Sequence, residues 1–395
     1  MCSIIGGTIF NEYALQVYDR AKDRGRDYSG FCQMGNYWIA NHRATPTNET
    51  AAPIDNQPFG KDFKIVHNGT IANDKELGNV DGAIDSKVLA EVIDATDIYS
   101  VRDSLNKVKG SYAIAILKKD EIILAANFKP IWYIHKEGQY FFSSLEWHLG
   151  AGAVRLKPYS VYSLTKGISC ELKRYQPNKA LIIASGGLDS TALTGYAKQR
   201  HEEIKLLHFN FGCKATNNEI AAIKTIASKL DCTYEVLDLD YTKFKGNSTL
   251  FKDDKINSGI SGVEYALDWV YARNLILLSI AVGYAEANGY GFIYIGTNLE
   301  ESGAYPDNEE QFILDFNSLL YGAVNNGYKV QIVTPLGGLM KKEIVEFGVE
   351  YNSPIEHSWS CYNNGSNHCG NCGPCYMRRK AFERAGVIDK TKYEV

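Results

Sequence analysis

The stretch SGGLDS, residues 185–190, combines residue types that are suited to holding a phosphate. It follows an apolar run at 179–184 and precedes a helix-like segment at 191–198. A strand, a glycine-rich turn and a helix in this order aim backbone N–H groups and the helix dipole at an anion. The glycines permit a close approach of the backbone and a positive φ. Asp189 would repel a phosphate, so we expect it to bind Mg²⁺ or to anchor the loop.

SGGLDS resembles the pyrophosphate loop of the PP-loop ATPases, which split ATP between the α- and β-phosphates and adenylate a substrate. The chain contains no G-x-x-x-x-G-K-[ST] sequence, so a Walker A loop is excluded. The alternative is a plain Gly-Gly turn with a polar helix cap. The resemblance implies ATP and Mg²⁺ as ligands, with ATP bound by Ser185, Gly186, Gly187, Leu188, Asp189 and Ser190.

Four cysteines close to the end of the chain form a second group with chemical potential. They are Cys361, Cys369, Cys372 and Cys375, with seven, two and two residues between successive members. Four thiols over so short a stretch predict a closed, structural, tetrahedral Zn²⁺ site. An iron–sulfur cluster is the alternative, and His368 is the adjacent alternative ligand.

Cys2 is the third candidate, because removal of Met1 would leave its thiol beside a free α-amino group that can serve as its general base. Four further features follow Cys2 in order along the chain. They are the motif R-G-x-D-x-x-G at 24–30, Arg43, the motif H-N-G-x-I-x-N at 67–73, and Asp85. Asn-Gly alone is also a type I′ turn, and Asp85 is also a plausible helix N-cap.

This order of motifs resembles the class II glutamine amidotransferases over about residues 2–165. The resemblance implies an N-terminal-nucleophile fold, a four-layer sandwich of helices around two sheets. It implies that Cys2 attacks the glutamine amide and that Asn68 and Gly69 form an oxyanion hole. Arg43 would bind the glutamine α-carboxylate and Asp85 its α-ammonium group. Thr70 and Lys87 stand where relatives often have acidic residues, which weakens the assignment of the α-ammonium contact.

Residues 179–390 resemble the QueC family of 7-cyano-7-deazaguanine synthases. The match rests on VYARN at 270–274, ESGAYPD at 301–307, Thr334-Pro335 and the segment 360–382 that carries the four cysteines. It implies that Arg273, Asn274, Tyr305 and Asp307 contact the base or nucleotide. Without the resemblance, Arg273 merely begins a helix and Pro306-Asp307 is a common turn pair.

The whole chain therefore resembles a glutaminase–QueC fusion. The implied function is glutamine- and ATP-dependent conversion of 7-carboxy-7-deazaguanine to 7-cyano-7-deazaguanine. One alternative is amidinotransfer onto a nitrile base in tRNA or DNA, which gives an archaeosine-type product. A second is an asparagine-synthetase-like ligase, which shares the domain order but not the cysteine tail. A third is a binding module that keeps the fold without activity, against which the intact Cys2 and SGGLDS argue.

The segment Asn210–Cys213 departs from the Tyr-Gly-Gln that QueC proteins usually have at this place. Cys213 could form a covalent thioimidate with a nitrile, or it could simply pack in the core. Arg378, Arg379 and Lys380 could contact a phosphate, although a solvated helix face is the favoured interpretation.

The elements that must position these residues follow two patterns. In the first half, a strand that begins at Lys64 is expected to run into the H-N-G-x-I-x-N motif. Paired strands are expected at 110–117 and 121–125, and a last strand at 156–164. In the second half, strands at 179–184, 204–209, 234–239, 292–296 and 330–334 alternate with helices at 191–198, 217–230 and 272–287. The alternation predicts a doubly wound parallel sheet with ligands at the strand carboxyl ends. We expect an α/β protein with a glutaminase domain at 2–168 and a PP-loop domain at 179–395.

Charge, apolar segments and cysteine content limit the binding partners and the cellular location that we expect. The chain has 395 residues, 45% hydrophobic and 22% charged, and a formal net charge of −4, which gives no electrostatic case for tight autonomous binding of nucleic acid. Its longest strongly apolar segment, 274–285, is too short to cross a membrane. With no signal-peptide pattern at the start, we expect a cytoplasmic protein whose nine cysteines are thiols or ligands. Glutamine and a 7-deazaguanine are the expected partners; a nucleic acid and a homodimer remain open.

Overall fold

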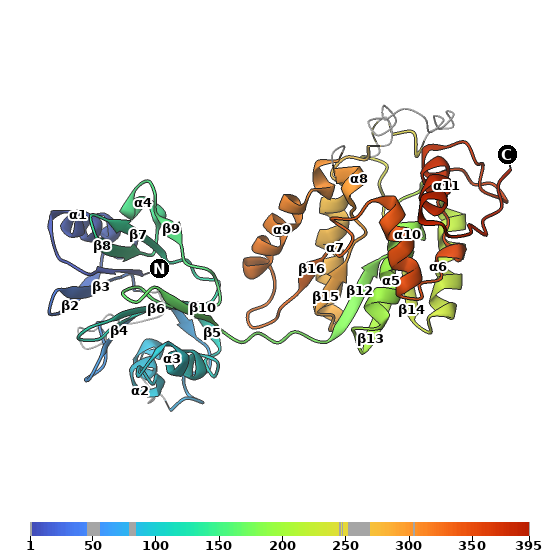
Figure 1. Cartoon of the computed structure of the whole chain (residues 1–395). Helices are drawn as coiled ribbons and strands as arrows, with labels where there is room; N and C mark the ends of the chain where they lie inside the picture. The colour runs from blue at the N-terminus through green and yellow to red at the C-terminus, as the bar shows by residue number, and fades with distance from the viewer. Residues whose placement is uncertain are drawn as a thin grey trace. The chain divides into compact units, whose positions relative to one another are not determined.

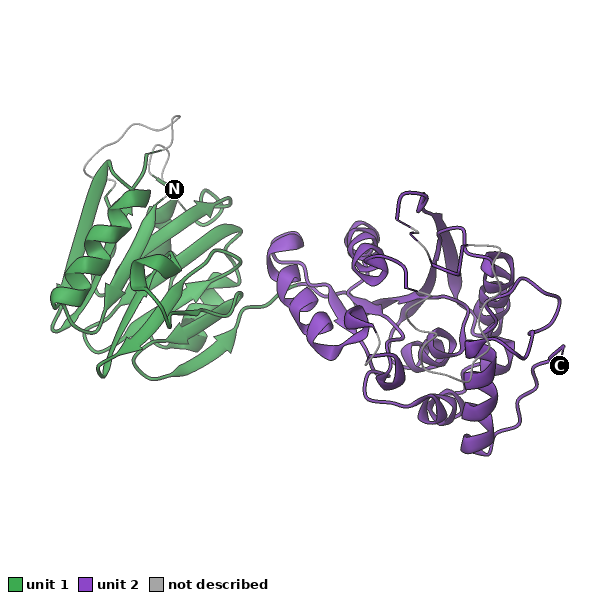
Figure 2. Ribbon diagram, turned by 90° about the horizontal axis from the view of Figure 1, so that it is seen from above, with its two compact units in different colours: residues 1–174 green, residues 175–395 purple. Residues whose placement is uncertain are grey.

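The computed structural model divides the chain into two compact units, residues 1–174 and 175–395 (Figure 2). The structure describes residues 2–45, 56–78, 84–244, 246, 248–251, 269–302 and 305–394. Each unit has its own sheets and its own hydrophobic core. Among the described residues, no helix combines the length and apolarity needed to cross a bilayer.

Two stacked sheets form the centre of the first unit. The six-stranded sheet has the order β2 (Tyr28–Met34), β3 (Tyr37–Arg43), β1 (Ser3–Gly7), β8 (Gln139–Ser143), β7 (Trp132–Lys136), β9 (Val154–Arg155). The five-stranded sheet has the order β11 (Ile168–Glu171), β10 (Ser160–Ser163), β6 (Ile122–Ala126), β5 (Gly110–Leu117), β4 (Lys64–Ile71). The expected pairing of 110–117 with 121–125 is confirmed by the antiparallel β5–β6 ladder.

Apolar side chains from both sheets meet between them. Ile4 and Ile39 of the first sheet share one buried cluster with Val66 and Leu124 of the second. On the outer face of the first sheet, Ala14 and Val17 of α1 (Glu12–Arg20) pack with Trp38.

Short helices complete the layers of this unit. The outer helices are α1 and α4 (Glu146–Leu149) on one side and α2 (Leu89–Val92) and α3 (Ile98–Leu105) on the other (Figure 1). The expected four-layer sandwich of helices around two sheets is confirmed.

The first unit continues through β11 before the chain passes to the second. β11 pairs with β10, from Ser160 opposite Glu171 to Ser163 opposite Ile168. The second unit begins at Tyr175, whose backbone bonds with Gly327 and Lys329. Most of β11 therefore lies beyond residue 168, where the sequence placed the end of the first domain.

A fully parallel five-stranded sheet forms the centre of the second unit. Its order is β14 (Thr233–Asp238), β13 (Glu203–Asn210), β12 (Lys179–Ile183), β15 (Phe292–Tyr294), β16 (Gln331–Val333). Every pair in this sheet is parallel, which confirms the expected doubly wound arrangement. The strand order reverses direction between β12 and β15, so the crevice for a ligand lies at that point.

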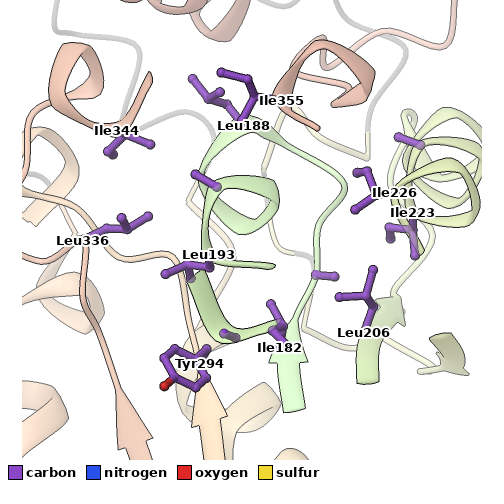
Figure 3. Close-up of a cluster of buried hydrophobic side chains, with 14 of the residues drawn as sticks. Ile182, Leu188, Leu193, Leu206, Ile223, Ile226, Tyr294, Leu336, Ile344 and Ile355 are labelled. Carbon is purple, nitrogen blue, oxygen red and sulfur yellow. The ribbon is translucent and has the colours of Figure 1, made fainter. Parts of the chain in front are cut away.

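Helices cover both faces of this sheet (Figure 1). They are α5 (Leu188–Lys198), α6 (Thr216–Lys229), α10 (Lys341–Glu350) and α11 (Gly373–Ala385) on one face, and α7 (Arg273–Asn288) and α9 (Glu310–Ala323) on the other. Figure 3 shows Leu193 of α5 and Ile223 of α6 in one buried cluster with Ile182 and Leu206 of the sheet. Helix α5, which follows the SGGLDS loop, is therefore held against the sheet by a packed core.

Candidate active sites

The SGGLDS loop lies at the strand-order switch point. It connects β12 to α5, and Gly187 is the residue that precedes the helix. Gly186 has φ +76°, and a Cβ atom there would stand 2.7 Å from the backbone oxygen of Glu219. The loop therefore needs glycine both for its backbone conformation and for its close approach to α6. Its contact with ATP remains a prediction.

Asp189 is held by a cation from a distant helix. Lys341 Nζ, at the start of α10, lies 2.5 Å from Asp189 Oδ2 and 2.7 Å from Glu301 Oε1. Asn298 Nδ2 donates to the same Asp189 oxygen at 3.1 Å. Burial alone would lower the pKa of Lys341, but the two carboxylates more than offset this and raise it, so the ammonium stays charged.

This arrangement favours the anchoring role for one oxygen of Asp189. Asp189 Oδ1 is buried and has no hydrogen-bond partner within the described ranges, so it retains capacity for a cation or water. Binding of Mg²⁺ stays a prediction. Lys341 was missed by sequence reasoning, because a lysine in a Gly-Gly-Leu-Met-Lys-Lys segment carries no signal that it faces the loop.

A cavity of about 520 Å³ opens beside the loop in the second unit. All four residues that the QueC resemblance assigns to the base or nucleotide line it, namely Arg273, Asn274, Tyr305 and Asp307. The loop residues Ser185, Gly187, Leu188, Asp189 and Ser190 line it as well. The cavity is of the size that accommodates a small-molecule ligand.

Three of the four residues, Asn274, Asp307 and Tyr305, also have structural partners. The buried Asn274 donates from its backbone N–H to Asp307 Oδ2 at 3.2 Å and from Nδ2 to Asn308 Oδ1 at 2.9 Å, so it holds the segment that carries Asp307. The Tyr305 ring stacks on Trp269, with centroids 5.8 Å apart and an interplanar angle of 8°. Trp269 was missed because a lone tryptophan in a sequence is more often a core residue.

In the first unit, strand pairing brings Cys2 to Arg43. Ser3 lies opposite His42 in the β1–β3 ladder, so extending the register by one residue places Cys2 opposite Arg43. Cys2 Sγ lies 4.0 Å from Ala44 O. Side chains alternate along a strand, so Cys2 faces the same way as Ile4, toward the second sheet. The roles of nucleophile and carboxylate ligand remain predictions.

Asn68 and Gly69 belong to β4 and face β5. They pair with Ala113 and Tyr112, so the alternative reading as a type I′ turn is wrong. Gly69 has φ +155°, and a Cβ there would stand 1.9 Å from Ser111 O. Asn68 is buried and shares the strand face of Val66, which points toward the first sheet. Cys2 and Asn68 thus both point from their own sheet toward the other.

Asp85 is not the helix N-cap that its position suggested. It is the first residue of a 3₁₀ turn, Asp85–Val88, and Ile84 precedes that turn as the capping residue. Asp85 Oδ2 accepts from Ile71 N at 2.6 Å, and Ser86 Oγ donates to Asp85 Oδ1 at 3.1 Å. The carboxylate is therefore tied to the end of β4, the strand that carries Asn68.

The four cysteine sulfurs converge as the sequence spacing predicts, all within 4.8 Å of one another. Cys361 and Cys372 Sγ are 3.9 Å apart, and Cys369 and Cys375 Sγ are 4.0 Å apart. Tetrahedral Zn–S bonds of about 2.3 Å place sulfurs about 3.8 Å apart, so the set fits one ion. A four-iron cluster would spread them further, because each sulfur binds a different iron.

The surroundings of the cysteines also suit thiolates. Backbone N–H groups of Asn363 and Cys369 point at Cys361 Sγ, at 3.3 and 3.4 Å. Such donors stabilise the thiolate form and orient it toward a metal. His368 is outside the converging set, and its Nε2 accepts from Ser360 N at 3.0 Å.

The prediction of a solvated face at 378–380 is wrong for Arg378. This guanidinium is buried, and its Nε lies 3.2 Å from Asp389 Oδ2. Its Nη1 donates to Ser358 Oγ at 2.6 Å. Arg378 therefore fixes the C-terminal segment on α11, whereas Arg379 is exposed.

Comparison with known proteins decides the family. Residues 179–386 match the model for "Queuosine biosynthesis protein QueC". The chain belongs to the QueC family. Residues 47–149 match a glutamine amidotransferase domain, so this QueC protein carries a fused amidotransferase domain.

Three relatives named 7-cyano-7-deazaguanine synthase show the extent of the match. That of Sulfolobus acidocaldarius is 37% identical over the whole length of both chains, and synthase 2 of Sulfurisphaera tokodaii is 38% identical over the same extent. That of Methanothrix thermoacetophila is 39% identical but covers 55% of this QueC chain and 99% of its own. The QueC region therefore occurs both alone and joined to an amidotransferase domain.

Proposed function

We propose that the chain converts 7-carboxy-7-deazaguanine to 7-cyano-7-deazaguanine with ATP, and that its first unit supplies the ammonia from glutamine. The observation that carries this proposal is the cavity of the second unit, which is lined both by five residues of the SGGLDS loop and by the four residues assigned to base or nucleotide. The full-length match to proteins named for this product supports it.

The chemistry requires two activations. ATP first adenylates the carboxylate, because a carboxylate oxygen is a poor leaving group, and ammonia displaces AMP to give the amide. A second ATP activates the amide oxygen, and loss of AMP leaves the nitrile. The backbone N–H groups of 186–188 and the helix dipole of α5 would bind phosphate oxygens. The Asp307 carboxylate can accept from the N1–H and N2–H₂ groups of a guanine-type ring.

The first unit would hydrolyse glutamine at Cys2. Asn68 and the Gly69 N–H would stabilise the tetrahedral oxyanion, and Arg43 would bind the glutamine carboxylate. Zn²⁺ is the metal we propose for the four cysteines, where it would hold the C-terminal segment in place. Mg²⁺ would accompany ATP, with Asp189 Oδ1 as the available protein oxygen.

The amidinotransferase alternative receives less support from the geometry. A thioimidate needs the Cys213 thiolate, yet burial, with Glu219 nearby, raises the pKa of Cys213 to about 12. At neutral pH the thiol is therefore almost wholly protonated. Asparagine synthesis is disfavoured by the cysteine site and by the family.

Mass spectrometry of the base product tests the proposal. Purified chain is incubated with glutamine and 7-carboxy-7-deazaguanine, with and without ATP, and in parallel with an oligonucleotide that carries the nitrile base. We expect the free nitrile and AMP only when ATP is present. An inert free acid together with a mass gain of ammonia on the oligonucleotide would refute the synthase and establish the alternative.

A further inference from the structure

A glutamate that the phosphate loop does not use lies against the same cavity. Glu219 is in the first turn of α6, directly behind the loop, since its backbone oxygen is the atom that a Cβ on Gly186 would meet. Its side chain lines the cavity and is 17% exposed. The Glu219 side chain therefore borders the cavity of the second unit and is largely shielded from solvent.

The nearest neighbours of Glu219 that the structure describes provide no positive charge in direct contact with its carboxylate. The Cys213 thiol lies 3.6 Å from Glu219 Oε2, and His208 Nε2 lies 3.9 Å from the same oxygen. His208 Nδ1 lies 2.8 Å from the Ala184 carbonyl, which only accepts, so Nδ1 carries the ring proton. The bare Nε2 is buried and has no hydrogen-bond partner in the part of the chain that the structure describes.

These surroundings favour a group that exchanges its proton near neutral pH. Burial raises the pKa of Glu219 to about 7, against smaller lowering effects of Cys213 and Arg273. Burial likewise lowers the pKa of His208, so the ring stays neutral and does not pair with the carboxylate as a cation. Within the described ranges, the titratable and charged groups that act on Glu219 are Cys213, His208 and Arg273.

The proposed reaction has one step that needs such a group. In the adenylated amide, carbon is bound to an N–H nitrogen and, through oxygen, to AMP. Nitrile formation breaks the N–H bond and places its electron pair in a third C–N bond. The C–O bond breaks at the same time, and AMP leaves with the electron pair of that C–O bond. The proton must be taken by a base, and no redox partner is required.

We propose that Glu219 is the base that takes this N–H proton in the nitrile-forming step. The inference rests on the proposed function and adds a catalytic residue to it. In the preceding amidation, the attacking ammonia also loses a proton. In that step, however, AMP can leave without the breaking of an N–H bond, whereas nitrile formation requires it. Removal of the base should therefore slow the second step more than the first.

The test compares Glu219→Gln with the intact chain and with Glu202→Gln, an exposed glutamate outside the cavity. Each is given 7-carboxy-7-deazaguanine, ammonium and ATP, and amide, nitrile and AMP are quantified by mass spectrometry. We expect Glu219→Gln to accumulate the amide, with nitrile formation slowed by roughly 10²-fold or more. AMP per base consumed should fall from two toward one, while Glu202→Gln matches the intact chain.

The amide given directly as substrate isolates the step. Its conversion by the intact chain should decline as the pH falls through about 7, the value to which burial raises the pKa of Glu219, and this decline should be absent in Glu219→Gln. Glu219→Asp should recover part of the rate, because it keeps a carboxylate.

Three results are distinguishable. No nitrile from the intact chain refutes the proposed function itself. Nitrile from the intact chain with an unchanged amide-to-nitrile ratio in Glu219→Gln overturns the role of Glu219. Equal loss of both steps in Glu219→Gln and Glu219→Asp also overturns it, because a folding or packing role would produce that pattern.

Discussion

Replacing Lys341 tests how much the charge of this lysine contributes to stability beside the SGGLDS loop. We predict that Lys341→Met destabilises the second unit by about 3 kcal/mol at pH 8. Methionine keeps the length and apolar stem of the side chain but removes the charge. The carboxylates of Asp189 and Glu301 then face one another without the cation that lies 2.5 and 2.7 Å from them.

The magnitude follows from the burial of the three side chains. Removing one partner of a buried ion pair costs about 3–5 kcal/mol, because an uncompensated charge remains. The side chains of Lys341 and Asp189 are 14% and 16% exposed, which places the pair in that class. Glu301 is 29% exposed and can regain water, so we take the lower end of the range.

The pH dependence provides an independent check. Burial raises the pKa of Asp189, and Lys341 partly offsets that effect. Without the lysine, both carboxyl groups should have folded-state pKa values above their unfolded values of about 4. A group of this kind binds its proton more tightly when folded, so its contribution to stability is lost as the pH rises. The penalty should therefore be larger at pH 8 than at pH 5.

The assay must report on the second unit alone, because the chain has two. Samples equilibrated in urea at each pH receive a short deuterium pulse, and mass spectrometry of peptides from α5 and α10 gives the unfolded fraction. Lys342→Met is the matched control, because its ion pair with Glu346 at 3.5 Å is about half exposed and should be worth under about 0.5 kcal/mol. A penalty for Lys341→Met below about 1 kcal/mol, or one equal at both pH values, would refute the reasoning.

Three further predictions concern the other sites. Cys2→Ser should reduce glutamate release by roughly 10³-fold or more while ammonium still supports product formation, as measured by mass spectrometry; loss of both would contradict a separate glutaminase site. Gly69→Ala should destabilise the first unit by about 2 kcal/mol or more in urea unfolding, because its Cβ would stand 1.9 Å from Ser111 O. Cys372→Ser should lower the zinc content from about one ion per chain, measured by inductively coupled plasma mass spectrometry; an unchanged content would argue against this ligand.

Local sequence determined much of the fold. The apolar run at 179–184 and the glycines after it dictate a strand and a turn, and both occur as β12 and the loop before α5. The alternation of strands and helices likewise favours a parallel sheet, since a helix between two strands carries the chain back to the end of the sheet where the first strand began. The spacing of the four cysteines brings their sulfurs together, because all lie within one short segment.

Other features depend on contacts between distant segments. Asp189 and Lys341 are 152 residues apart, and no pattern near either residue indicates that they meet. Asp85 has the sequence of a helix cap, yet it accepts from Ile71 because the end of β4 lies beside it. Arg378 looks like part of a charged surface run, yet the C-terminal segment folds over it and supplies Asp389.

The sequence by itself thus determined the alternating strands and helices of the second unit, the glycine-rich loop, the cysteine cluster and the family resemblance, because each is encoded by neighbours along the chain. Only the tertiary structure decided which charged side chains lie close enough to neutralise one another. It placed Lys341 beside Asp189, and it placed Glu219 where a buried carboxyl has no cationic histidine to pair with. The physical reason is that charge compensation and burial depend on distance in space, which strand order and helix packing set.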